Sequence, residues 1–403
     1  MMNAIELFAG AGGLGMGVTL AGFKTSSVIE FDKWACDTLR ENKGRDQPLV
    51  RSWDVVEDDV RNFPFIDHRG RVDLIAGGPP CQPFSMGGKH RAQLDNRDMF
   101  PAMISAIRAT MPKAFIVENV KGLTRETFHN YFEYIKLQLR FPHVLQKRNE
   151  SWTRHMARLE ECSSEALNDG TTYELIPRLV NAADYGIPQK RQRIFMVGIR
   201  HDLHVPWSFP EETHSQEALL HSQLVTGEYW DKHKVARKHR PEISAPTKAM
   251  RERMEKAVAE GDRPWMTVRD ALQGMPAPEE GSGSFLNHTY QPGARIYPGH
   301  TGSPIDLPAK TLKAGVHGVP GGENMMVKPD GSVRYFTIRE AARLQTFPDT
   351  YILHGAWSEA MRQLGNAVPV ALARVVASSV ASALIRAEEN SLREKLQRKG
   401  RLQ

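Results

Sequence analysis

Short runs of apolar residues alternate with stretches of helical periodicity over the first half of the chain. Such runs, bounded by glycine, proline or polar residues, are typical of buried strands. We expect strands at residues 4–8, 25–29, 72–76, 114–117, 173–180 and 193–199, and a helix at 100–110. Because strands that alternate with helices indicate βαβ units, the pattern predicts an α/β fold whose parallel sheet has helices on both faces.

The pattern changes after about residue 200. Residues 201–330 are rich in proline, glycine, histidine and tryptophan and show little periodicity, which is typical of a smaller second domain built from irregular loops. Residues 369–387 then form a strongly apolar helix, which must pack against a core. The expected divisions are a first domain at 1–200, a second at 201–335, and a C-terminal segment at 336–403 whose helix returns to the first domain.

The composition of the 403 residues is that of a soluble globular protein, with 40% hydrophobic and 25% charged residues. A net charge of +6 is compatible with a polyanionic partner, because Lys and Arg displace the counterions of phosphates. The N-terminus lacks the basic region of a secretory signal, and no apolar run approaches the roughly 20 residues that span a bilayer. We therefore expect a cytoplasmic protein without a membrane partner.

The sequence contains three cysteines, Cys36, Cys81 and Cys162. They lie far apart and form no Cys-x-x-Cys pair, so neither a disulfide framework nor a cysteine zinc site is expected. Three histidines of the second domain, His288, His300 and His317, also lack the spacing of metal ligands. The sequence therefore predicts no metal.

One of these cysteines has an unusual setting. The strand expected at 72–76 is followed by the sequence Gly-Gly-Pro-Pro-Cys-Gln-Pro-Phe-Ser, residues 77–85. The glycines allow a tight turn and the two prolines stiffen it, so Cys81 is held at the carboxyl end of a strand, where open α/β sheets bind ligands. Two interpretations stay open on this evidence: a nucleophilic thiol, or a buried structural cysteine.

A glycine-rich loop follows the first expected strand. Residues Gly10 to Gly15 satisfy the Gly-x-Gly-x-x-Gly pattern, and Glu30 lies 20 residues beyond Gly10 at the end of the next strand. This is the fingerprint of a nicotinamide dinucleotide site, with the carboxylate on the ribose hydroxyls. S-adenosylmethionine has the same ribose, and Phe31 can lie against an adenine in either case. The spacing leaves both cofactors open, with a structural glycine turn as a third reading.

Six short motifs then occur in a fixed order. They are Phe8–Gly13, Gly78–Ser85, Glu118–Val120, Gln189–Arg193, Arg343–Pro348 and Gln363–Asn366. From residue 5 to about residue 380 this ordered set resembles the DNA (cytosine-5)-methyltransferases of bacterial restriction–modification systems. The resemblance implies a Rossmann-like mixed sheet of the S-adenosylmethionine-dependent methyltransferases, with helices on both faces. Residues 1–200 become the catalytic and cofactor-binding domain, and 201–335 the target-recognition region.

The resemblance favours S-adenosylmethionine as the cofactor and implies a set of contacts with it. Glu30 would bind the ribose, Phe31 would lie beside the adenine, and Asp59, preferred to Asp54, would contact the adenine amino group. The family often has Ser after Asn366, where this chain has Ala367. The implied cofactor residues are Phe8, Ala9, Gly10, Ala11, Gly12, Gly13, Leu14, Glu30, Phe31, Asp59, Val60, Pro80, Asn366 and Ala367.

The implied chemistry is attack of a thiolate on C6 of cytosine, which makes C5 able to accept a methyl group. Cys81 is then the nucleophile. Glu118 would protonate or hydrogen-bond N3, Arg193 would donate to O2, and Arg191 would orient Glu118 or bind phosphate. Because the target carbon is hidden in a stacked duplex, the base must swing out of the helix.

The remaining candidates are expected to contact DNA. Residues 85–97 read as a basic loop that closes over the duplex, and the segment at 270–330 would read base edges. The DNA-binding candidates are Gln82, Ser85, Lys89, Arg91, Arg97, Gln189, Arg295, His300 and Lys313, with Thr301, Lys310 and His317 as further base-reading candidates. We expect a monomer that binds double-stranded DNA, with a cognate restriction endonuclease as a possible partner in the same system.

Three rival functions remain. A nicotinamide-dependent oxidoreductase accounts for the glycine loop but leaves the Cys81 segment and the Gln189–Arg193 motif unexplained. A tRNA cytosine methyltransferase shares the chemistry, although the long variable region favours duplex DNA. A catalytically silent DNA-binding protein would not need Cys81, Glu118 and Arg193 together.

Overall fold

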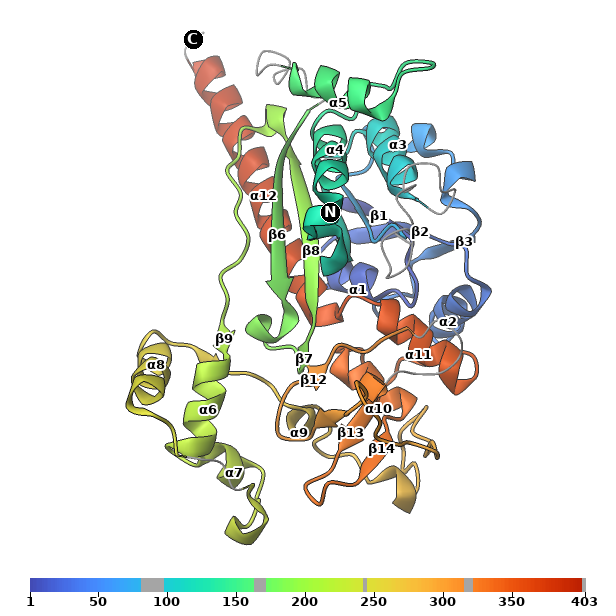
Figure 1. Ribbon diagram of the computed structural model, residues 1–403. Coiled ribbons are helices and arrows are strands. Elements are labelled where there is room, and N and C mark those ends of the chain that lie inside the picture. The colour runs from blue at the N-terminus through green and yellow to red at the C-terminus, as the bar shows by residue number, and fades with distance from the viewer. Residues whose placement is uncertain (81–97, 163–171, 242–244, 315–321, 401–403) are drawn as a thin grey trace.

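The computed structural model describes residues 1–80, 98–162, 172–241, 245–314 and 322–400. In this part of the chain the central feature is a seven-stranded sheet in the order β3-β2-β1-β4-β5-β8-β6 (Figure 1). The strands are β1 (Asn3–Leu7), β2 (Lys24–Glu30), β3 (Asp54–Glu57), β4 (Leu74–Gly77), β5 (Ala114–Val120), β6 (Tyr173–Asn181) and β8 (Gln192–Arg200).

The sheet is mixed. β1 to β5 pair in parallel, as the alternation of strands and helices predicts, whereas β8 runs antiparallel to both β5 and β6. The expectation of a parallel sheet is therefore wrong at this edge, and the mixed sheet implied by the resemblance is confirmed. The cause lies in the connection, since β6 and β8 are joined by only a short loop (182–191), which permits an antiparallel pair but not a crossover helix.

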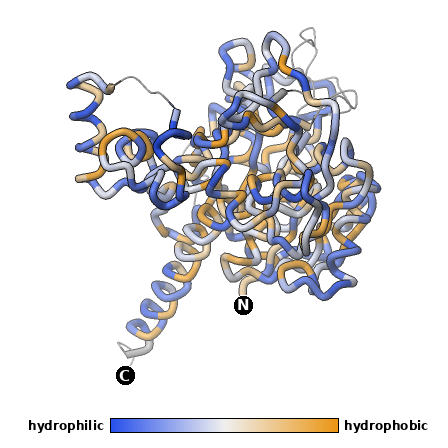
Figure 2. The backbone as a smooth tube through the Cα atoms, turned by 90° about the horizontal axis from the view of Figure 1, so that it is seen from below, coloured by the Kyte–Doolittle hydropathy of each residue, from blue (hydrophilic) through white to orange (hydrophobic). Residues whose placement is uncertain are grey.

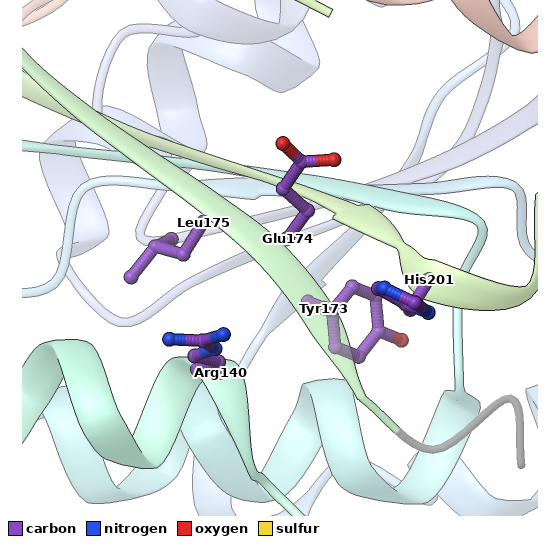
Figure 3. Close-up of a pocket in the computed structure, with 5 residues that line it drawn as sticks. All are labelled: Arg140, Tyr173, Glu174, Leu175 and His201. Carbon is purple, nitrogen blue, oxygen red and sulfur yellow. The ribbon is translucent and has the colours of Figure 1, made fainter. Parts of the chain in front are cut away.

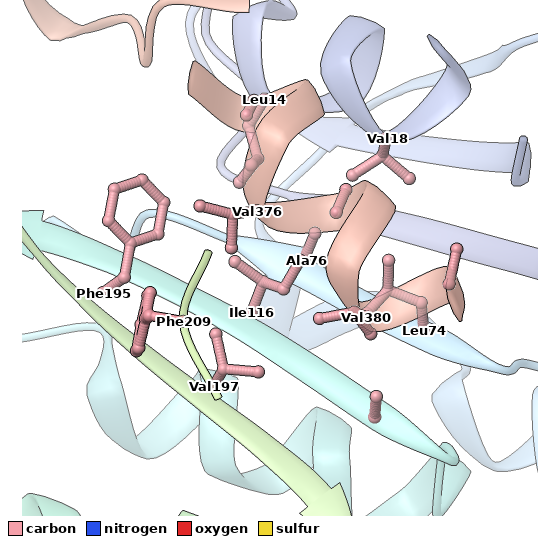
Figure 4. Close-up of a cluster of buried hydrophobic side chains, with 14 of the residues drawn as sticks. Leu14, Val18, Leu74, Ala76, Ile116, Phe195, Val197, Phe209, Val376 and Val380 are labelled. Atoms are coloured by element: carbon pink, nitrogen blue, oxygen red, sulfur yellow. The ribbon is translucent and has the colours of Figure 1, made fainter. Parts of the chain in front are cut away.

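Both faces of the sheet are buried because consecutive strand residues point to opposite sides. On one face Ala4, Leu74 and Ile116 pack with α1 (Gly13–Leu20) and α12 (Val370–Gly400) (Figure 4). On the other face Ile5, Ile75 and Phe115 pack with α3 (Phe100–Thr110) and α4 (His129–Arg140). This two-sided burial explains why β4 and the first half of β5 are continuous apolar runs rather than alternating ones.

The C-terminal helix returns to the first domain, as expected. α12 packs against α1, and Val376 and Val380 lie in the core between α12 and the sheet. The segment Trp357–Arg398 is long and apolar enough to cross a membrane, but 61% of its most apolar window is buried inside the fold, as in a core helix. The last part of α12 projects from the body of the molecule (Figure 2).

Short elements dominate the second half. The helices are α6 (Gln216–Leu224), α7 (Glu228–Lys232), α8 (Lys248–Ala259), α9 (Val268–Ala271), α10 (Ile338–Leu344) and α11 (Trp357–Asn366), beside α2 (Lys33–Gly44) and α5 (Trp152–Glu160) in the first half. The strands are β7 (Gln189–Lys190), β9 (His214–Ser215), β10 (Arg263–Pro264), β11 (Ser303–Pro304), β12 (Ala309–Lys310), β13 (Met325–Val327) and β14 (Val333–Tyr335). The helices of 216–259 were not predicted from the sequence.

A third core joins the two halves. Ala11, Met16 and Trp53 of the first domain pack with Phe347, Tyr351 and other apolar residues of the segment 336–366. Tyr351 also donates a 2.8 Å hydrogen bond from its hydroxyl to the Ala11 carbonyl oxygen in the glycine-rich loop. The C-terminal segment therefore supports that loop from below.

Candidate active site

The glycine-rich loop connects β1 to α1 at the carboxyl edge of the sheet. Gly10 and Gly12 have φ angles of +53° and +81°, which L-residues with side chains seldom adopt. A Cβ atom on Gly12 would lie 2.9 Å from Leu39 and Trp53, and one on Gly13 would collide with the carbonyl oxygen of Val368. Gly12 and Gly13 are thus required by close packing against the loop, whereas Gly10 is favoured by its positive φ angle alone.

Glu30 lies directly beside this loop. Its carboxylate accepts hydrogen bonds from the backbone N–H groups of Gly10 at 2.6 Å, Phe31 at 2.8 Å and Asp32 at 2.7 Å. β1 and β2 are parallel neighbours, so their carboxyl ends meet at one edge. The Phe31 side chain is 76% exposed, and its ring is therefore available to a ligand.

The structure separates the two aspartates considered for the adenine. Asp54 begins β3 and is paired with Ser27, far from the carboxyl edge, whereas Asp59 follows the end of the strand. The backbone N–H of Asp58 donates to the Glu30 carbonyl oxygen at 3.1 Å, which brings this turn to Glu30. The position favours Asp59. Its carboxylate is paired with Arg61, which lowers the pKa of Asp59.

Glu118 and Arg193 form a buried ion pair at the same edge. The Nε atom of Arg193 lies 2.9 Å from Oε1 of Glu118, and both side chains are about one-tenth exposed. A Cβ atom on Gly78 would lie 3.0 Å from Oε2 of Glu118, so the carboxylate faces the end of β4. The Asn119 side-chain amide donates to the Pro79 carbonyl oxygen at 2.9 Å, which fastens the proline turn to β5.

Burial governs the protonation of this pair. Desolvation raises the pKa of Glu118, and the charges of Arg193 and Arg191 oppose the rise. Desolvation also lowers the pKa of Arg193. A raised pKa favours the protonated carboxyl group, which is the form that can deliver a proton to a bound base.

The structure corrects the assignment of Arg191. Its guanidinium is fully buried and donates to the carbonyl oxygens of Leu312 at 3.2 Å, Gly365 at 2.7 Å and Ala367 at 2.8 Å. Arg191 therefore has no access to a phosphate and forms no hydrogen bond with Glu118 among the described contacts. It acts on Glu118 through its charge and holds the end of α11 in place.

Asn366 and Ala367 lie where that arginine fixes the chain. Asn366 is exposed at the end of α11, Ala367 is buried, and the next carbonyl, that of Val368, packs on Gly13 of the glycine-rich loop. The junction of α11 and α12 thus abuts the loop from the C-terminal half of the chain. This position is compatible with closing one side of a cofactor pocket.

Gln189 also differs from its expected role. It is fully buried; its side-chain amide donates to the Leu344 carbonyl oxygen at 3.4 Å and its carbonyl accepts from the Leu312 N–H at 3.1 Å. A side chain committed in this way is not free to contact DNA. Gln189 is a structural residue that ties β7 to the C-terminal half.

The second-half candidates are more varied. Arg295 is exposed, His300 stacks on Tyr297 with ring centroids 4.1 Å apart, and Lys313 pairs with Glu323 at 2.7 Å. Thr301 accepts a hydrogen bond from Lys310, and His288 is buried, with its ring nitrogens against Thr337 and the Pro276 carbonyl. Lying outside the described residues are Cys81, Gln82, Ser85, Lys89, Arg91, Arg97 and His317.

Sequence reasoning missed Glu6. This residue of β1 is buried beneath the glycine-rich loop, where Oε1 accepts a hydrogen bond from the Gly15 N–H at 2.8 Å and Oε2 has no partner among the described residues. Desolvation raises the pKa of Glu6 to about 8, and the Gly15 hydrogen bond opposes the rise. The available signal was a carboxylate within a buried apolar run, between Ile5 and Leu7.

A separate cavity of about 360 Å³ lies near the start of β6 and is lined by Arg140, Tyr173, Glu174, Leu175 and His201 (Figure 3). Tyr173 pairs with Arg200, next to the residue that pairs with Ala114 at the amino end of β5. Glu118 is near the other end of β5. The cavity is therefore at the opposite edge of the sheet from the site described above.

Comparison with known proteins identifies the family. Residues 2–141 and 153–382 match the model of the C-5 cytosine-specific DNA methylase family. The chain is 31% identical to the type II methyltransferase M.PspPI of Psychrobacter sp. (strain TA137), and 30% identical to M.Eco47II of Escherichia coli. Each alignment covers 94% of this chain and 78% of the relative.

Among solved structures, the fold is similar to that of the S. pombe Dnmt2 methyltransferase. The TM-score is 0.55 at 17% identity, and the match covers 96% of this chain and 99% of that one. At this identity the likeness concerns the fold. The family match and the curated relatives decide the activity class. The chain belongs to the C-5 cytosine-specific DNA methylase family and is a DNA (cytosine-5)-methyltransferase of the type II restriction–modification kind.

Proposed function

We propose that this methyltransferase transfers a methyl group from S-adenosylmethionine to C5 of a cytosine swung out of double-stranded DNA, with Cys81 as the nucleophile. The observation that supports the proposal most directly is the buried Glu118–Arg193 pair beside the proline turn that leads to Cys81. The glycine-rich loop and Glu30 lie at the same sheet edge. The described residues thus place a buried carboxylate and the glycine-rich loop at one sheet edge, beside the turn from which the chain continues to Cys81.

The residues at the loop fit S-adenosylmethionine. Glu30 presents a carboxylate for a ribose diol, Phe31 an exposed ring for an adenine, and Asp59 an acceptor for its amino group. When bound, the cofactor supplies an activated methyl group on a positively charged sulfur. Asn366 and Ala367 lie at the junction that abuts the loop, and we place the remaining side of the pocket there.

The residues of the chain divide the reaction between them. The Cys81 thiolate adds to C6 of the ring, and the electron pair displaced from the C5–C6 bond makes C5 nucleophilic. Glu118 holds a proton at N3 while charge enters the ring, and Arg193 donates to O2. After C5 has taken the methyl group, a water molecule accepts the C5 proton, the electron pair of that C–H bond re-forms the C5–C6 double bond, and the C6–sulfur bond breaks. The ring and the thiolate are restored, and the proton at N3 returns to Glu118.

Domain roles follow from this assignment. Residues 1–200 bind the cofactor and carry the reacting groups, residues 201–335 recognise the target, and the segment 336–403 completes the first domain. Arg295, His300 and Lys313 are the described residues we retain as candidates for reading the DNA. Arg191 and Gln189 are excluded from that role by their burial.

The test is transfer of labelled methyl groups from S-adenosylmethionine to duplex DNA, followed by bisulfite sequencing to locate the modified cytosines. The Cys81→Ser variant should lose activity, and DNA with 5-fluorocytosine at the target should trap a covalent Cys81 adduct, because fluorine cannot leave as a proton does. Near-full activity of Cys81→Ser, or an active enzyme without the adduct, would overturn the proposed mechanism.

A further inference from the structure

The helices α6, α7 and α8 form a small module that stands apart from the sheet, at the lower left of Figure 1. Leu219, Tyr229, Trp230 and Trp265 make its core together with Ala183 of the first domain. The Trp230 indole donates to the Gln223 carbonyl oxygen at 2.8 Å. The module is therefore an ordered unit with its own packing.

A strongly basic segment follows α7. Residues 232–240 read Lys-His-Lys-Val-Ala-Arg-Lys-His-Arg, with five cationic side chains and no carboxylate. Two of the cations are neutralised nearby: Lys232 pairs with Asp270 at 2.6 Å, and Arg240 pairs with Asp231 at 2.9 Å. The other three are Lys234, Arg237 and Lys238.

These three side chains are exposed, and no ion pair is found for them within the described part of the chain. The backbone that carries them is nevertheless fixed. The Val235 N–H donates to the Trp230 carbonyl oxygen at 2.9 Å, and the Arg240 Nε atom donates to the Val235 carbonyl oxygen at 3.1 Å. The segment thus displays three uncompensated cations from a preorganised turn, an arrangement that fits a row of phosphates.

The module is also tied to the site. The Trp265 indole donates to Oδ1 of Asp184 at 2.9 Å, and the Lys190 ammonium lies 4.6 Å from the centre of the Trp265 ring. Lys190 ends β7, and the chain continues directly through Arg191 to Arg193, the partner of Glu118. The module is therefore attached, through Trp265 and Lys190, to the strand that borders the Glu118 site. A duplex whose target base occupies that site passes beside a strand to which the module is fixed.

We propose that Lys234, Arg237 and Lys238 bind backbone phosphates of the DNA duplex that flanks the recognised sequence. The inference rests on the proposed function, since it takes duplex DNA as the substrate. Phosphate contacts carry no sequence information, so this surface adds affinity and salt dependence without changing which cytosine is methylated.

The test compares two triple variants with the same change in net charge. The first is Lys234→Gln/Arg237→Gln/Lys238→Gln, and the second is Arg393→Gln/Lys395→Gln/Arg398→Gln, at exposed positions near the distant end of α12. Binding of each is measured on a duplex just long enough for the mapped site and on one extended by about two helical turns on each side.

On the long duplex, the first variant should bind at least tenfold more weakly than wild type. Its slope of log affinity against log salt should be shallower by about 2 to 3, at about 0.9 per lost phosphate contact. On the short duplex, its affinity and kcat should equal those of wild type, and the second variant should behave as wild type throughout.

Equal affinity of wild type and the first variant on the long duplex would overturn the inference. An equal loss on both duplexes would also overturn it, because the effect would then be independent of flanking DNA. So would an equal loss in the second variant, because the effect would then follow from net charge alone. Failure of the proposed function gives a different result, namely no methylation of any DNA by the wild-type enzyme, while the affinity and salt slope of both variants can still be compared with those of wild type on a long duplex of arbitrary sequence.

Discussion

The Nε atom of Arg193 lies 2.9 Å from Oε1 of Glu118, across two antiparallel strands in which Glu118 is paired with Phe195 and Val120 with Arg193. The two side chains are therefore diagonal neighbours on one face of the sheet. Both side chains are buried, and the loss of solvation disfavours each charge by more than the attraction between the two charges favours it. The result is a carboxyl group with a raised pKa and a guanidinium with a lowered one.

The Glu118→Gln variant should lose kcat by roughly 10² to 10⁴-fold, the usual contribution of a positioned proton donor. Gln can still donate a hydrogen bond to N3 but cannot transfer a proton. The measurement is single-turnover methylation of duplex DNA, with cofactor affinity as the control, which should be unchanged. Wild-type kcat in this variant would remove Glu118 from the mechanism.

Arg193→Met should move the pH profile of the reaction. The proposed role requires Glu118 to be protonated, so the rate falls as pH rises through its pKa. Because the Arg193 charge lowers that pKa, its removal should raise it and shift this limb to higher pH, besides lowering kcat. The check is kcat against pH for both enzymes; a shift to lower pH would contradict the electrostatic assignment.

Arg191→Met should destabilise the fold rather than alter the chemistry alone. The change removes the hydrogen bonds of Arg191 to the carbonyl oxygens of Leu312, Gly365 and Ala367, of which the last keeps a 3.3 Å hydrogen bond from the Gln345 side chain. We expect a loss of about 3 kcal/mol or more in the free energy of unfolding. Denaturant unfolding measures it, with the exposed Arg148→Met as the control, which should change stability by less than about 0.5 kcal/mol.

Gly13→Ala should weaken cofactor binding sharply, because the new Cβ atom would collide with the Val368 carbonyl oxygen and push the glycine-rich loop from the α11–α12 junction. Gly44→Ala is the matched control. Its Cβ atom would meet no atom within 4 Å. Ala in place of this helical Gly should raise the free energy of unfolding by up to about 1 kcal/mol. Calorimetric titration with S-adenosylmethionine distinguishes the two; equal affinities would refute the packing argument.

Stability should depend on pH through Glu6. Its folded pKa of about 8 exceeds the ordinary value of 4.5, so the folded protein keeps a proton that the unfolded chain releases. The stability from Glu6 is fully present below about pH 4.5 and is lost as pH rises towards 8. The measurement is the midpoint of thermal unfolding between pH 5 and 8. Glu6→Gln should reduce the fall of this midpoint with rising pH, whereas Glu126→Gln, at an exposed position, should not.

Much of the fold could be predicted from the local sequence. The strands expected at 4–8, 25–29, 114–117 and 193–199 match β1, β2, β5 and β8 to within three residues at each end. The reason is that strands covered on both faces by helices need a buried apolar stretch, and this stretch is visible in the local sequence whatever its neighbours are. The short helices of 216–259 escaped prediction, because their core of aromatic residues with Ala183 has no strong period along the chain.

The sequence by itself determined the strands of the central sheet other than β3, the return of the C-terminal helix, the family, and the presence of Glu30 and Glu118 at strand ends. Only the tertiary structure decided between Arg191 and Arg193, which differ by two positions in one motif. Arg193 faces Glu118, while Arg191 is enclosed by carbonyls of residues 312, 365 and 367. Partners so distant along the chain leave no local pattern, and hydrogen bonding after burial, rather than residue type, set the role of each arginine.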